Sequence, residues 1–328
     1  SPSPERVAPA CAHYGDCGGC ALQHVDDAAE HRLKETVWLE QLARIGGVRP
    51  QTVLSAVGGA DWHYRTRTRL AWDGEHLGYR ARAGNRVVPI THCLTLAPAL
   101  ATRLPDIRAL CATLARTTAI LGVDLSAGDD VNVLRIRLRD AVDTLPAQEA
   151  VARWNDGAAQ PWQIWLQSGR DRVTKHPAAA PPLAYTLPAY GLTLPYAPDD
   201  FTQVNKALNR ELVAIALAAL DFQPGERVLD FFCGLGNFSL PLARSGAEVY
   251  LQSSSRSPAL VWGALQRKRR FADPYDADVP YYLYNLADPR AYGHIFICHE
   301  HPANAALRET AATLDARLLH LRAKRCYY

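Results

Sequence analysis

Residues 227–238 read Arg-Val-Leu-Asp-Phe-Phe-Cys-Gly-Leu-Gly-Asn-Phe, and this stretch decides the fold. Its first half, residues 227–232, is mostly apolar and is typical of a buried strand. Gly234 and Gly236 predict a tight turn in which the backbone can approach a ligand closely. A helix is expected from about Asn237, so the stretch predicts a strand, a glycine turn and a helix in succession.

The sequence on either side extends this pattern. Apolar residues at helical spacing share one face of residues 208–220, and Pro224-Gly225 ends that helix. Residues 247–252 predict another strand. A strand, a turn, a helix and a strand form the opening of a parallel α/β sheet, in which ligands bind beyond the carboxyl ends of the strands.

An acidic residue, Asp230, stands at the end of the first of these strands. A carboxylate there suits the ammonium group of an amino-acid ligand, and the turn departs from the Gly-x-Gly-x-x-Gly spacing of dinucleotide folds. The alternative is a tight turn whose glycines serve packing alone. The strand–loop–helix setting favours ligand binding.

Three of the eight cysteines lie in one short segment, as Cys11, Cys17 and Cys20, and Cys93 is the candidate for a fourth ligand. In a reducing cytosol such a group indicates a metal or cofactor site rather than disulfides. Thiolates at this spacing can bind one soft metal centre, and the spacing alone does not separate zinc from an iron–sulfur cluster. Unliganded loop cysteines are the remaining alternative.

Two segments alternate between arginine and other residues, as strands do. In residues 64–70 the alternation puts Arg65, Arg67 and Arg69 on one face, and residues 131–139 repeat the pattern. Arg80 and Arg82 lie nearby in sequence among aromatic residues. Such a stripe can follow RNA phosphates, but it is equally compatible with an ordinary solvated strand face.

Composition is that of a water-soluble globular enzyme. The chain has 328 residues, enough for two domains, with 48% hydrophobic residues, 21% charged residues and a net charge of only +3. No apolar run reaches the roughly 20 residues that a membrane helix needs, and Ser1–Arg6 lacks the apolar core of a signal peptide. We therefore expect a cytoplasmic monomer without membrane contact.

The cofactor stretch resembles a known family. Residues 230–238 are similar to the first cofactor motif of the RNA (uracil-C5) methyltransferases, a subgroup of the class I (Rossmann-like) enzymes that use S-adenosylmethionine, and residues 200–205 are similar to the segment preceding it. The resemblance implies contacts with S-adenosylmethionine from Gln203, Phe232 and Asn237, and a cofactor-side position for Asn285. Together with Asp230, Gly234 and Gly236, these residues form the expected cofactor site.

The cysteine segment carries a second resemblance. Residues 11–24, with Thr91-His92-Cys93, are similar to the 4Fe–4S site of the family members that act on large-subunit ribosomal RNA. The resemblance implies a cluster bound by Cys11, Cys17, Cys20 and Cys93, with a structural or RNA-positioning role. It also implies that the activity is C5 methylation of a specific uridine in 23S ribosomal RNA, through a covalent adduct between a cysteine and C6 of the base.

The resemblance becomes weaker toward the C-terminus. The family's acidic residue after the second strand is replaced by Gln252, and the expected aspartate of a later motif by His301. Cys326 is the candidate nucleophile by position, and an incidental cysteine is the alternative. The family's C-terminal base would fall beyond residue 328, so we expect the catalytic domain to be C-terminally incomplete.

These observations predict two parts. Residues 1–200 would form a β-rich, RNA-binding central region with the 4Fe–4S cluster, and residues 201–328 a class I methyltransferase domain; the helix at residues 31–45 is expected to pack on the second part. Two other functions stay open: a catalytically inactive RNA-binding relative, and a small-molecule methyltransferase with a zinc site.

Overall fold

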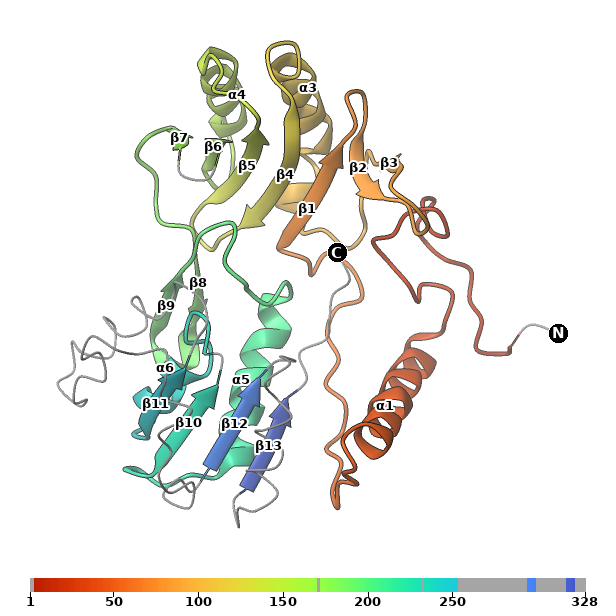
Figure 1. Ribbon diagram of the computed structural model, residues 1–328, viewed down its shortest axis with the longest axis vertical. Helices are drawn as coiled ribbons and strands as arrows, with labels where there is room; N and C mark the ends of the chain where they lie inside the picture. Colours follow the sequence, from red (N-terminus) through yellow and green to blue (C-terminus); the bar gives the residue numbers. More distant parts are fainter. Residues whose placement is uncertain (1–2, 170–171, 232, 253–293, 299–316, 322–328) are drawn as a thin grey trace. The chain divides into compact units, whose positions relative to one another are not determined.

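The chain folds into two compact units, Ser1–Pro181 and Pro182–Cys326, each described by itself. The computed structural model describes residues 3–169, 172–231, 233–252, 294–298 and 317–321 (Figure 1). The domain boundary near residue 200 stays a prediction, because compactness alone divides the chain between Pro181 and Pro182. Among the described residues, no helix combines the length and the apolar character needed to cross a membrane.

A seven-stranded sheet in the order β3-β2-β1-β4-β5-β6-β7 forms the centre of the first unit. Strands β5 and β6 are parallel, and α4 makes the crossover that a parallel pair requires. The other neighbours are antiparallel. The strands are β1 Arg67–Trp72, β2 Leu77–Arg80, β3 Val87–Pro89, β4 Ile120–Ala127, β5 Asn132–Leu138, β6 Trp162–Ser168 and β7 Arg172–His176.

The core of this unit lies between one face of the sheet and two helices, α3 (Leu104–Leu114) and α4 (Leu145–Asn155), as Figure 1 shows. Alternate strand residues fill it, among them Leu70, Val123, Leu134, Ile136 and Ile164. The intervening residues point to the opposite face, where Arg69, Asp124 and Arg135 are in register. The predicted alternation of both arginine-bearing strands is therefore confirmed in β1 and β5.

The first unit also contains the helices α1 (Asp27–Arg44) and α2 (Pro98–Ala101). Helix α1 confirms the helix predicted at residues 31–45. It begins where the Asp26 carboxylate accepts a hydrogen bond from the Ala29 N–H at 3.1 Å, and the chain leaves it through Gly47 at a positive φ of 64°.

The second unit is built around a parallel sheet in the order β11-β10-β12-β13. Strand β10, helix α6 and strand β11 confirm the strand–turn–helix–strand pattern read from the sequence. A small antiparallel pair, β8-β9, precedes them. The elements are β8 Ala184–Leu187, η1 Pro188–Tyr190, β9 Leu192–Pro195, α5 Lys206–Leu220, β10 Arg227–Phe231, α6 Ser239–Arg244, β11 Glu248–Gln252, β12 His294–Cys298 and β13 Arg317–Leu321.

Candidate functional site

The glycine loop lies at the carboxyl end of β10, an inner strand of the parallel sheet. The chain runs from β10 through α6 to β11 on one side, whereas β12 and β13 lie on the other side, so the strand order reverses next to β10. Ligands of open α/β sheets bind at such a reversal. Gly234 and Gly236 have positive φ angles of 54° and 86°, and the Gly236 N–H donates to the Cys233 carbonyl at 2.8 Å. The predicted tight turn is confirmed.

Asp230 lies at the start of this loop, and only one of its two carboxylate oxygens has a hydrogen-bond partner among the described residues. Its side chain is 1% exposed, and Oδ2 accepts a short hydrogen bond from the Ser239 hydroxyl, at the start of α6. Oδ1 is buried and has no hydrogen-bond partner among the described residues. Burial raises the pKa of Asp230 to about 7, and the hydrogen bonds from Ser239 oppose this rise. An open acceptor at a strand end can bind a ligand donor.

The Asn237 side chain is locked by two residues that the sequence argument missed. Asn237 and Asn209 exchange two amide hydrogen bonds, each 2.8 Å long, and the Tyr185 hydroxyl donates to Asn237 Oδ1 at 3.0 Å. Asn209 lies on the buried face of α5 and is 4% exposed. A buried asparagine inside an apolar helix face was the signal available in the sequence. The predicted contact between Asn237 and the cofactor stays a prediction.

The remaining predicted cofactor residues are less defined. Gln203 is half-buried and lies just before the N-cap of α5, where Asn205 Oδ1 accepts from the Leu208 N–H at 3.0 Å. Phe232, Asn285 and the candidate nucleophile Cys326 lie outside the described residues, as does His301.

The four predicted ligand cysteines line one pocket in the first unit. Cys11, Cys17, Cys20 and Cys93 surround it together with residues that include His13, Gln23 and Tyr79, and none of the four thiols is in a disulfide. Burial raises the pKa of the Cys17 and Cys20 thiols, and the neighbouring cysteine thiols raise it further, whereas a hydrogen bond to each from Gly19 and Gln23, respectively, lowers it.

The cysteine pocket fits a metal centre by its donor set rather than by its present geometry. Four thiols are the ligands of both iron–sulfur clusters and structural zinc. Among the residues that the structure describes, however, no three potential ligand side chains have an arrangement that could hold a metal ion. The metal site therefore stays a prediction.

The five arginines predicted to bind RNA fall into different settings. Arg65 and Arg67 are both 8% exposed, and Arg69 forms an ion pair with Asp124 at 2.7 Å. The other two lie beside the cysteine pocket: the Arg80 carbonyl accepts from the Gly18 N–H at 2.9 Å, and Arg82 donates to the Ala21 carbonyl at 3.2 Å. Arg80 and Arg82 thus attach the cysteine segment to the sheet, and RNA contact stays a prediction for all five.

Comparison with known proteins agrees with the sequence resemblance. Residues 183–258, which include the glycine loop, match the family described as tRNA (Uracil-5-)-methyltransferase. Curated relatives include the 23S rRNA (uracil(1939)-C(5))-methyltransferases RlmD of Bordetella pertussis and Thiobacillus denitrificans. The first is 41% identical over 258 residues, which is 76% of this chain and 54% of the relative. The second is 38% identical over 266 residues, which is 76% of this chain and 59% of the relative.

The chain is thus similar in sequence to RNA (uracil-C5) methyltransferases. The predicted resemblance is confirmed, and a third RlmD enzyme, from Aromatoleum aromaticum, is 38% identical over 82% of this chain. The chain spans between 54% and 63% of the length of these three relatives.

A solved structure shows the same fold. The Pyrococcus abyssi tRNA (uracil-54, C5)-methyltransferase, solved in complex with S-adenosyl-L-homocysteine, matches 92% of this chain and 72% of its own with a TM-score of 0.60. Because the two sequences are only 16% identical, this similarity supports the mixed α/β fold alone.

Proposed function

We propose that this chain carries out S-adenosylmethionine-dependent C5 methylation of a uridine in 23S ribosomal RNA. The observation that carries the proposal is the open Oδ1 of Asp230, buried at the end of β10 beside the glycine turn. A buried carboxylate oxygen without a partner suits the ammonium of an amino-acid ligand. The curated relatives are named for this reaction on 23S rRNA, which supports the same assignment here.

Different residues of the second unit would have different roles in binding the cofactor. Asp230 would accept a hydrogen bond from the amino group, Gly234 and Gly236 would let the backbone approach it, and Asn237 would keep the loop in place through Asn209. Gln203, Phe232 and Asn285 are the further candidates for contact. Bound S-adenosylmethionine would supply an electrophilic methyl group.

The uracil ring needs activation before it can take that methyl group, because C5 is a poor nucleophile. The thiolate of Cys326 is our candidate to add to C6, which places the electron pair of the broken C5–C6 double bond in an enolate whose C5 can attack. After methylation, a base must remove the C5 proton, and the returning electron pair expels the thiolate.

The reaction is tested by transfer of labelled methyl from S-adenosylmethionine to unmodified ribosomal RNA, followed by digestion to nucleosides. We expect label in 5-methyluridine, its loss in Cys326→Ala, and its retention in Cys111→Ala, which replaces a cysteine buried in the core of the first unit. RNA binding without any methyl transfer would overturn the proposal in favour of an inactive RNA-binding relative.

We further propose that Cys11, Cys17, Cys20 and Cys93 bind a 4Fe–4S cluster with a structural or RNA-positioning role. Their convergence on one pocket supports this, because Cys93 lies far along the chain from the other three. Protein purified without oxygen should contain iron and sulfide in equal amounts and absorb broadly in the visible range. Cys20→Ala should lose both, whereas Cys111→Ala should keep them. Stoichiometric zinc without sulfide would overturn the cluster and support the zinc alternative.

A further inference from the structure

A row of charged and aromatic residues crosses the sheet of the first unit on the face opposite α3 and α4. Arg69, Asp124, Arg135, Trp165 and Lys175 are successive partners across the five strands β1, β4, β5, β6 and β7. Paired residues of neighbouring strands project from the same face. Four strand spacings of about 4.8 Å make the row roughly 19 Å long. We call this surface the polar face.

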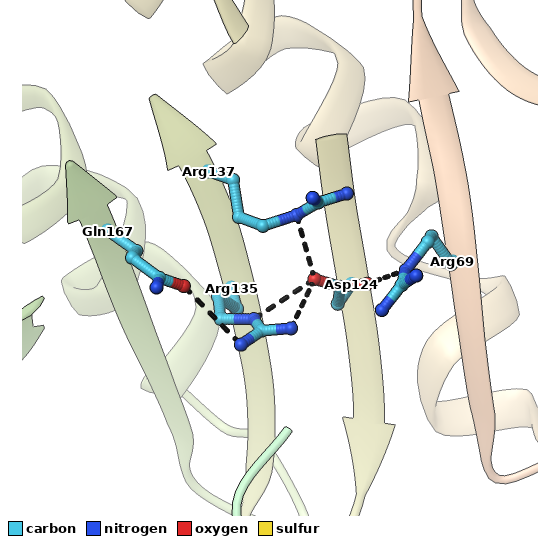
Figure 2. Close-up of polar contacts among 5 residues, drawn as sticks. All are labelled: Arg69, Asp124, Arg135, Arg137 and Gln167. Atoms are coloured by element: carbon cyan, nitrogen blue, oxygen red, sulfur yellow. Dashed lines mark hydrogen bonds and ion pairs between the residues drawn. The ribbon is translucent and has the colours of Figure 1, made fainter. Parts of the chain in front are cut away.

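Asp124 organises the arginines of the polar face, as Figure 2 shows. Its Oδ1 accepts from Arg69 Nε at 2.7 Å, and its Oδ2 accepts from Arg135 Nε at 3.0 Å. The Arg137 Nε lies 3.4 Å from the same Oδ2. One carboxylate therefore faces three guanidinium groups, which leaves an excess of positive charge at the centre of the row.

Arg137 keeps part of its side chain accessible to a further partner. Its side chain is 33% exposed, although its Nε is buried beside Asp124. The guanidinium lies over Gly122 of the neighbouring strand, where a Cβ would come within 2.1 Å of Arg137 Nη2. Glycine at position 122 therefore leaves room for this conformation. An arginine whose side chain is one-third exposed can present its terminal amino groups to a phosphate.

Lys175 adds a second cation to the polar face. At β7, the Lys175 ammonium lies 4.0 Å from the centre of the Trp165 ring, whose Nε1 donates to Gln163 Oε1 at 2.7 Å. The ring is thus fixed and in turn positions the ammonium.

We propose that the polar face binds the sugar–phosphate backbone of the RNA substrate through Arg137 and Lys175, with Asp124 as a positioning residue. The choice of RNA as the ligand rests on the proposed function. The charge of the face complements phosphate, and its planar donors suit phosphate oxygens. Asp124 fixes the guanidinium groups before binding, so less side-chain freedom is lost when RNA binds.

The test is the binding of a short fluorescein-labelled single-stranded RNA of mixed sequence to the whole chain, measured by anisotropy over a range of salt concentrations. Arg137→Gln and Lys175→Gln should each weaken binding and reduce the slope of log affinity against log salt by about 0.7, the value for one phosphate contact on a single strand. The matched control is Arg108→Gln, which removes an exposed arginine of α3 behind the sheet and should leave the slope unchanged.

Asp124→Asn distinguishes a positioning role from bulk charge. The variant raises the net charge by one, so bulk electrostatics predicts tighter RNA binding, whereas loss of positioning predicts weaker binding. The glutamine variants test the face independently if this variant folds poorly.

Equal slopes for wild type, Arg137→Gln and Lys175→Gln would overturn the proposal, as would equally tight binding of polyglutamate. Because the assay needs no methyl transfer, its failure is separate from that of the proposed function. Methyl transfer with unchanged RNA binding by the variants would overturn only the role of the polar face.

Discussion

Two carboxylates are almost equally withdrawn from water in the two units, but their surroundings are opposite. Asp124, 3% exposed, has three arginines around it, and each of its oxygens accepts a hydrogen bond. Asp230 is 1% exposed. One of its oxygens accepts a hydrogen bond from the Ser239 hydroxyl, and the other oxygen has no hydrogen-bond partner among the described residues. Both oxygens of Asp124 therefore have hydrogen-bond partners within the first unit, whereas one oxygen of Asp230 has no partner among the described residues.

The difference separates a positioning residue from a binding residue. A buried carboxylate surrounded by guanidinium groups satisfies its neighbours, so the fold depends on it. A buried carboxylate with an open oxygen costs stability, and such groups persist where a ligand uses them. We therefore expect replacement of Asp124 to act first on stability and replacement of Asp230 to act first on ligand binding.

Asp124→Ala should have the largest effect. It leaves Arg135, whose side chain is 6% exposed, without its counter-ion, and the free energy of unfolding should fall by about 3–5 kcal/mol. Urea unfolding followed by tryptophan fluorescence suits this measurement, because six of the seven tryptophans lie in the first unit.

The control for Asp124→Ala is Asp106→Ala, which breaks an exposed ion pair of 3.2 Å with Arg103 and should cost under about 1 kcal/mol. Equal losses in the two variants would show that the arginines do not depend on Asp124, and the contrast with Asp230 would disappear.

Asn209→Ala should come next. The variant removes both amide hydrogen bonds to Asn237 and leaves buried polar atoms without partners, which should cost about 2–3 kcal/mol locally. Hydrogen exchange of the α5 and α6 amides would report the loss. Tyr185→Phe removes one hydrogen bond to the same side chain and should cost about 1 kcal/mol. Unchanged exchange in Asn209→Ala would mean that this pair does not hold the Asp230 loop.

The sequence predicted the elements that depend on local pattern. The alternation in residues 64–70 and 131–139 gave β1 and β5, and the apolar run with two glycines gave β10 and its turn. These signals are periodic or conformational, so they are visible in one segment at a time. The convergence of Cys93 with Cys11, Cys17 and Cys20 was predicted from the cysteine pattern and the resemblance, and the structure places all four around one pocket.

The sequence alone could not predict which residues form ion pairs or hydrogen bonds with the predicted site residues. Arg69 was assigned to RNA from its alternation, yet its strand partner Asp124 lies far along the chain, and only the register of β1 with β4 reveals the ion pair. In the same way, Asn209 meets Asn237 only after α5 packs beside the loop. Long-range pairing of polar groups leaves no periodic signal in the sequence.

The pH dependence of stability tests the protonation of Asp230. Burial raises its pKa from the ordinary value of 3.8 to about 7, so the folded chain holds this proton more tightly than the unfolded chain. Stability from this group is complete below the unfolded pKa and is lost as the pH rises through about 7, by at most about 1.4 kcal/mol per pH unit. Urea midpoints of the wild type should therefore fall between pH 5 and pH 7 more than those of Asp230→Asn. Parallel curves would mean that Asp230 is charged throughout, as expected for a carboxylate that is already satisfied.

Asp230→Asn should have the smallest effect in free energy, and it tests directly whether Asp230 binds the cofactor. The side chain keeps its shape and loses its charge, so an ammonium donor loses a charge-assisted hydrogen bond, and S-adenosylmethionine should bind about tenfold more weakly, or about 1.4 kcal/mol. Calorimetric titration of the cofactor measures this directly, with Asp130→Asn, at an exposed carboxylate of the first unit, as the charge-matched control. If Asp230→Asn binds the cofactor as the wild type does, the open oxygen serves no ligand, and Asp230 must be explained by the fold alone.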